Sequence, residues 1–136
     1  MNIGSIVWPS DGRVAIKLYL GFLIKVIEAL GIKFSSAGPD PLATTKSYIA
    51  GSLPEDEYRS SANVWWGYLD GTGATRDLES KDALNARIAI CLLSVTLDDV
   101  EDLGEHLSWF FEVLGQLGVD LDMPIDMMTE YFKFED

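Results

Sequence analysis

His106 is the only histidine in the chain, and histidine is the side chain best suited to general acid–base catalysis near neutral pH. Asp102 lies four residues earlier, a spacing that lets the two side chains hydrogen-bond on one helix and create a general base. Hydrolysis by a serine nucleophile would need more, and the Gly-x-Ser-x-Gly turn that presents such a serine does not occur. We therefore expect His106 to be a surface residue of an acidic helix, and we predict no catalytic residues and no enzyme activity.

Residues that could hold a metal ion are few. One cysteine and one histidine cannot supply the ligand sets of the usual zinc sites. Three carboxylates, Asp120, Asp122 and Asp126, lie within seven residues and are chemically suited to calcium. The calcium-loop pattern needs glycine at its sixth position and glutamate at its twelfth, where this chain has Ile125 and Tyr131. The sequence therefore predicts no metal site and no cofactor.

Cysteine usage and the longest apolar stretch both bear on the compartment. Cys91 is the only cysteine and lies in an apolar run, so we expect a buried thiol and no disulfide within the chain. The stretch over residues 14–30 contains Lys17, Lys25 and Glu28, whose charges are costly inside a bilayer. We therefore expect a buried helix instead of a membrane span, no membrane partner, and a cytoplasmic protein.

The charge of the chain is concentrated in its second half. The whole sequence has 22 acidic and 10 basic residues, a formal net charge of −12, and a hydrophobic fraction of 48%. Residues 1–68 carry six bases and six acids, whereas residues 69–136 carry four bases and sixteen acids. A chain this apolar folds instead of staying disordered. Its negative charge disfavours direct binding to nucleic acid. The acidic half is either a solvated surface that keeps the chain soluble or a docking surface for a basic protein partner.

The spacing of apolar residues predicts one all-α domain over residues 1–136, with five or six helices after a short extended N-terminal arm. Residues 12–30 are apolar nearly all round, which is typical of a central core helix, and Gly31 is placed to end it. Residues 77–95 are ambiguous, because a continuous apolar run suits a helix or a fully buried strand, and we favour the helix. The alternative is an α+β fold with strands near residues 3–8, 87–95 and 129–134.

The best-defined element begins at the capping signal of Thr96. Apolar residues then recur at spacings of three and four up to residue 117, which predicts one helix with a buried seam. The opposite side carries five carboxylates: Asp98, Glu101, Asp102, Glu105 and Glu112. Trp109 falls on that side too and would form an aromatic anchor among the carboxylates, unless it packs under a neighbouring segment. A seam this regular also suits a homodimer interface.

Two adjacent tryptophans raise a similar question about exposure. Trp65 belongs to the apolar face of its predicted helix and is expected in the core. Trp66 shares a face with Arg59 and Asn63, so we expect its indole to reach the surface.

In charge, size and expected helical architecture, the chain resembles bacterial immunity proteins, small acidic cytosolic antitoxins that block cationic toxins such as nucleases. The resemblance rests on no sequence motif. It implies a binding protein whose acidic face covers the active site of a basic toxin domain, with complementary charge steering the association. The residues expected to bind the partner are Asp98, Glu101, Asp102, Glu105, Trp109, Glu112, Asp120 and Asp122.

Two further functions stay open at the level of sequence. Spaced carboxylates can imitate phosphates, which would make the chain a nucleic-acid mimic that inhibits a DNA-binding protein. The neutral first half argues against an extreme form of such mimicry. The aromatic-rich helices could instead form the walls of a pocket in a small ligand-binding domain or enzyme.

Overall fold

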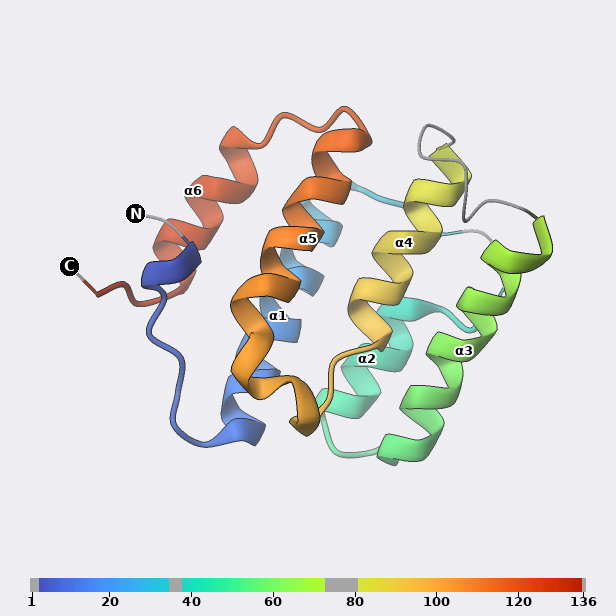
Figure 1. The fold of residues 1–136 in the computed structure, drawn as a ribbon, viewed down its shortest axis with the longest axis horizontal. Helices are drawn as coiled ribbons and strands as arrows, with labels where there is room; N and C mark the ends of the chain where they lie inside the picture. Colours follow the sequence, from blue (N-terminus) through green and yellow to red (C-terminus); the bar gives the residue numbers. More distant parts are fainter. Residues whose placement is uncertain (1–2, 35–37, 73–80, 136) are drawn as a thin grey trace.

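The computed structural model describes residues 3–34, 38–72 and 81–135, and the regular structure of these residues is helical (Figure 1). In chain order the elements are η1 (Ile3–Ser5), α1 (Gly12–Leu30), α2 (Pro41–Ile49), α3 (Glu55–Thr72), α4 (Lys81–Leu93), η3 (Leu97–Asp102), α5 (Leu103–Gln116) and α6 (Asp122–Tyr131). Among the described residues the only extended pairing is one isolated bridge between Ile6 and Phe134. The predicted all-α fold is confirmed, and the α+β alternative is wrong.

Helix α1 contacts α2, α4, η3 and α6, so nearly every side of it is covered. Nine of its side chains are buried, as its apolar sequence predicts. The Asp11 carboxylate accepts a hydrogen bond from the backbone N–H of Arg13 at 2.9 Å and caps the start. Gly31, with φ of 68°, ends the helix. In Figure 1, α4 and α5 lie in front of α2 and α1, with α3 and α6 at opposite ends.

The ambiguous segment forms helix α4, which packs against α2, α3 and α5. Nine of its side chains between Ala83 and Leu93 are buried. A helix covered on several sides needs little polar surface, which explains why its apolar run also fits a buried strand. Cys91 is buried as expected, and burial raises the pKa of its thiol, which makes the thiol unreactive. Residues 77–80, the start of the predicted segment, lie outside the described residues.

The single helix predicted after Thr96 is divided in the structure. Leu97–Asp102 form the 3₁₀ helix η3, and α5 begins only at Leu103. The capping signal itself is confirmed, because the backbone N–H of Thr96 donates to the Asp99 carboxylate at 2.9 Å. A 3₁₀ helix turns every three residues, so η3 does not continue the faces of α5. The prediction of one continuous helix is therefore wrong.

The predicted seam packs inside the chain. Leu103, Leu107, Phe110 and Leu114 are completely buried in the core. Val100 and Leu117, at the two ends of the seam, pack partly buried against the same core. This apolar surface is already covered by the chain's own residues, so it is not free to form the homodimer interface that its regularity suggests.

The two ends of the described chain lie side by side. Ile3–Ser5 form a 3₁₀ turn, so the predicted N-terminal arm is extended only after that turn. The backbone N–H of Val7 donates to the Lys133 carbonyl at 2.8 Å, and that of Glu135 donates to the Ser5 carbonyl at 2.8 Å. The strand suggested near residues 129–134 does not form. Helix α6 continues to Tyr131, and the residues after it make these two backbone hydrogen bonds to the N-terminal segment.

Gly21 lies where α1 meets Tyr131 of α6. A Cβ atom placed on this glycine would lie 2.9 Å from Oη of Tyr131. That hydroxyl donates a hydrogen bond to the Leu18 carbonyl at 2.9 Å, and the Lys25 ammonium lies 5.8 Å from the centre of the same ring. Glycine at position 21 therefore makes room for the contact that fastens α6 to α1.

Replacing Gly21 with alanine sets two effects against each other. Alanine favours a helix by about 1 kcal/mol over glycine. The added methyl group would displace the Tyr131 hydroxyl, and overpacking of this kind costs about 1–3 kcal/mol. We expect Gly21→Ala to lower the free energy of unfolding in urea by about 1 kcal/mol. In a Tyr131→Phe background the same change should raise it, and an equal lowering in both backgrounds would contradict this contact.

Candidate functional site

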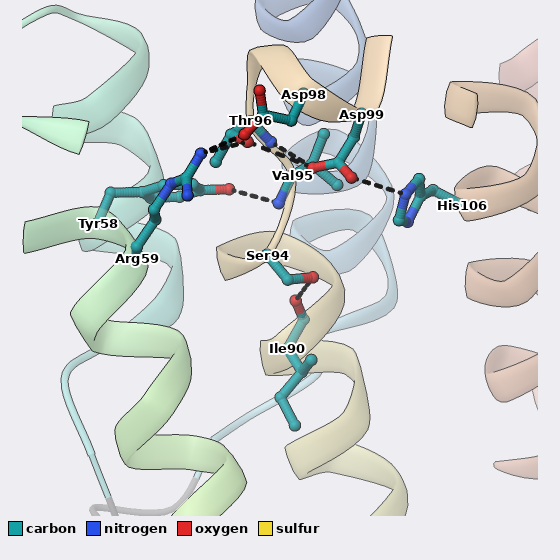
Figure 2. A network of polar contacts seen from close by, with 9 residues as sticks. All are labelled: Tyr58, Arg59, Ile90, Ser94, Val95, Thr96, Asp98, Asp99 and His106. Carbon is teal, nitrogen blue, oxygen red and sulfur yellow. Dashed lines mark hydrogen bonds and ion pairs between the residues drawn. The ribbon is translucent and has the colours of Figure 1, made fainter. Parts of the chain in front are cut away.

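A polar network joins α3 to the start of η3 (Figure 2). The guanidinium of Arg59 donates from Nη2 to the Thr96 hydroxyl at 3.0 Å and to the Asp98 carboxylate at 2.9 Å. The same nitrogen lies 3.7 Å from the carboxylate of Glu55, one turn earlier on α3. The hydrogen bond to Asp98 raises the pKa of Arg59 above its usual value. Arg59 therefore offsets negative charge where α3 meets η3.

Tyr58 of α3 holds the turn between α4 and η3 in place through its hydroxyl group. Its hydroxyl donates to the Leu92 carbonyl at 2.6 Å and accepts a bond from the Val95 N–H at 3.4 Å. The Thr45 hydroxyl of α2 donates to the same Leu92 carbonyl at 3.2 Å. A carbonyl near the end of a helix has no partner within that helix, and these bonds supply one. The position of η3 is thus fixed by side chains from α2 and α3.

His106 pairs with a residue other than the one its spacing suggests. Its Nε2 lies 3.6 Å from Oδ1 of Asp99, and both side chains are 29% exposed. The expected partner, Asp102, is exposed at the end of η3. The 3₁₀ geometry explains the difference, because residues 99 and 102 do not lie where a continuous α-helix would place them. Asp99 also caps η3, so the Asp99–His106 pair links the cap to α5.

The carboxylates predicted to bind a partner all lie at the surface. These are Asp98, Glu101, Asp102, Glu105, Glu112, Asp120 and Asp122, a set of exposed carboxylates between η3 and the start of α6 that we call the acidic face. Asp98 pairs with Arg59. The other six form no ion pair with any residue in the described part of the chain. Glu105 and Glu112 are seven residues apart on α5, so they lie on one side of that helix.

Trp109 does not stand out into solvent as the predicted anchor. Its side chain is partly buried and packs against the core. The reason is the width of the buried side of α5, where Phe111 and Val113 are buried as well as the seam residues. The apolar side is therefore broader than the three-and-four pattern predicts, and it takes in Trp109. The partial burial of Trp109 agrees with the alternative expectation, in which this tryptophan packs against other parts of the chain.

Trp66 is the exposed tryptophan beside the acidic carboxylates. Its side chain is 38% exposed, as its face on α3 predicts. It lines an open hollow of about 440 Å³ together with Arg59, Asn63, Asp98 and Asp99. Sequence reasoning placed the anchor on α5, because nothing in the sequence shows that residue 66 and residue 98 meet. Helix α3 packs on α4, and Arg59 of α3 bonds directly to Thr96 and Asp98, so the two segments meet only in the folded chain.

Within the described ranges, no group of three or more His, Cys, Asp or Glu residues is placed to hold a metal ion. In the same part of the chain, no helix has the length and apolar character needed to cross a membrane. No protein-family model, curated protein or solved structure matches this chain. Its own geometry is therefore the basis for a functional proposal.

Three buried side chains make the stability of the fold sensitive to alkaline pH. Burial raises the pKa of Tyr58, Tyr19 and Cys91 in the folded chain. Each group therefore keeps its proton in the folded state at a pH where the unfolded chain loses it. This stabilisation is complete below the unfolded pKa values, 9.0 for cysteine and 10.0 for tyrosine, and is lost as pH rises above them.

We expect the free energy of unfolding, measured in urea between pH 8 and pH 11, to fall by about 1.4 kcal/mol per pH unit for each group, above pH 9 for Cys91 and above pH 10 for the two tyrosines. Tyr58→Phe should lower stability at pH 8 by about 1 kcal/mol, because the bond to Leu92 is lost. The same variant should show a shallower alkaline decline, since one titrating group is gone. A decline as steep as that of the original chain would contradict the role of Tyr58.

Proposed function

We propose that this chain is a small acidic binding protein that covers the basic surface of a protein partner, in the manner of an immunity protein that neutralises a cationic toxin. The observation that supports the proposal is the acidic face, in which six exposed carboxylates have no ion-pair partner among the described residues. They extend from η3 along α5 to the start of α6.

These carboxylates do little for the fold itself. Exposed charges contribute little to stability even when they are paired, and like charges near one another repel. A partner with a basic surface would relieve that repulsion and would also be attracted at a distance, which speeds association. The arrangement is therefore suited to an intermolecular contact. Within the chain, Asp120 accepts a hydrogen bond from the backbone N–H of Asp122 at 3.0 Å, and Glu105 and Asp122 lie in the first turns of their helices.

The hollow beside Trp66 supplies the apolar part of the proposed contact. Tryptophan is among the residues most enriched in binding hot spots, and its ring attracts a cation placed over its face. Asp98 and Asp99 line the same hollow. A lysine or arginine of the partner would find an aromatic ring there, beside two carboxylates that Arg59 and His106 already contact. In the proposal, Trp66 takes the anchoring role that the sequence suggests for Trp109.

The proposed mode of action is occlusion, with binding and not catalysis as the function, in a cytoplasmic setting. A toxin that acts on nucleic acid needs a positive surface to hold its substrate. The acidic face would cover that surface and exclude the substrate by charge and by volume. The chain itself would bind no nucleic acid directly, because its negative surface repels phosphates.

Charge reversal on the acidic face tests the proposal. The partner is first captured from a lysate of the native cell with a tagged chain and is identified by mass spectrometry. Asp102→Lys, Glu105→Lys and Glu112→Lys together should weaken its binding by about 100-fold or more, with little change in urea stability. Binding by the original chain should also weaken as salt rises.

The matched control reverses three exposed carboxylates elsewhere, Glu57→Lys, Glu130→Lys and Glu135→Lys, and has the same net charge. It should retain most of the affinity, because its changes lie off the acidic face. Equal losses in the two variants would mean that total charge is what matters and would overturn the proposed surface. Capture of no basic protein would overturn the proposed class of partner.

The two tryptophans are distinguished by a separate comparison. Trp66→Ala should weaken partner binding by about 30-fold, the effect of losing a hot spot worth about 2 kcal/mol. Trp109→Ala should leave the affinity within about threefold and instead lower the free energy of unfolding by about 1–3 kcal/mol, because its side chain packs on the core. The reverse result, measured by calorimetry and urea denaturation, would restore Trp109 as the anchor.

A further inference from the structure

A second hollow lies on the other side of η3 from Trp66. It has a volume of about 370 Å³ and is lined by the first turns of α1, the end of α2, the start of α3 and one residue of η3. Leu97 lines this hollow, whereas the next residue, Asp98, lines the hollow beside Trp66. The short helix η3 thus separates two concave surfaces with different linings.

The wall of this second hollow is apolar and firmly held. Ile16, Ile49 and Leu53 contribute aliphatic surface, and Tyr48 contributes an aromatic ring. That ring stacks on the buried ring of Tyr58 with centroids 3.9 Å apart and planes 8° from parallel. Because Tyr58 is itself hydrogen-bonded to the end of α4, the aromatic wall is fixed before any ligand arrives. A pre-formed apolar wall is typical of small-molecule sites.

Two cations line the same hollow and are not neutralised. Arg13 and Lys17 lie one turn apart on α1, and both side chains are exposed. Neither forms an ion pair with any residue that the structure describes. The one carboxylate of the lining, Glu55, is directed in part to Arg59 at 3.7 Å. The lining therefore has an excess of positive charge, on a chain whose net charge is −12.

We propose that this hollow binds a small organic anion, with an apolar, planar body and a single carboxylate, sulfonate or phosphate group. The body would lie against Tyr48 and the aliphatic wall, and the anionic group would be held by Arg13 and Lys17 together. The volume falls at the lower end of the range for sites that bind drug-sized molecules, about 300–1,000 Å³. This inference is independent of the proposed function, because it uses other residues and a ligand of opposite charge.

The test uses 8-anilinonaphthalene-1-sulfonate, an aromatic sulfonate whose fluorescence rises in an apolar site. The folded full-length chain should give a saturable one-site titration. Arg13→Gln with Lys17→Gln should raise the dissociation constant for the dye at least tenfold. The control, Lys33→Gln with Lys133→Gln, has the same net charge and alters two exposed lysines outside the hollow, so it should stay within twofold. Each variant is first shown to unfold in urea like the original chain, because this dye also binds loosened cores.

A second measurement locates the dye on the chain. Backbone amide shifts in a titrated ¹⁵N-labelled sample should change around residues 13–17 and 48–55. Shifts clustered around Trp66 and α5 would overturn the proposal, as would a titration that does not saturate or an equal loss of affinity in both double variants. Uncharged 1-anilinonaphthalene should bind at least tenfold more weakly than the sulfonate, and equal binding would remove the proposed role of the two cations.

Discussion

The fold depends on covering a helix that is apolar on nearly every side. Nine side chains of α1 are buried, and leaving such a surface in water would cost far more than any single polar contact in the molecule can return. The chain therefore places α2, α4, η3 and α6 against α1. A narrow polar edge remains on α1, and in its first turns this edge carries Arg13 and Lys17. The positive rim of one hollow is thus a consequence of how the core is closed.

The turn after α4 determines where η3 lies, and η3 lines two hollows that differ in their residues. Leu92 receives hydrogen bonds from Tyr58 and Thr45, which fixes where the chain leaves α4 and where η3 must begin. From there η3 separates a hollow lined by Leu97 and two cations from one lined by Asp98 and an exposed indole. The hollow lined by Leu97 carries two cations and Glu55, and the hollow beside Trp66 carries two carboxylates and Arg59, so the balance of charge differs between them. A small change in this turn would alter both surfaces together.

The part of the acidic face on α5 depends on which side of that helix is buried. One broad side of that helix is buried in the core, and the narrow remaining side holds carboxylates that no base within the described residues neutralises. Arg59 is the exception at the edge, because it crosses from α3 to bind Asp98. Negative charge is therefore high along α5 and partly offset at the hollow beside Trp66. That gradient would orient a basic partner as well as attract it.

The elements that depend on local signals can be predicted from the order of the residues alone. The bounds of α1, the cap at Thr96, the burial of Cys91 and the exposure of the acidic side chains all follow from apolar spacing and capping chemistry. The remaining features depend on how the helices pack against one another. This packing made residues 97–102 a 3₁₀ helix, paired His106 with Asp99, covered Trp109 and brought Trp66 beside Asp98. The reason is that periodicity reports how many sides of one helix are buried, whereas which residues meet depends on how separate helices pack.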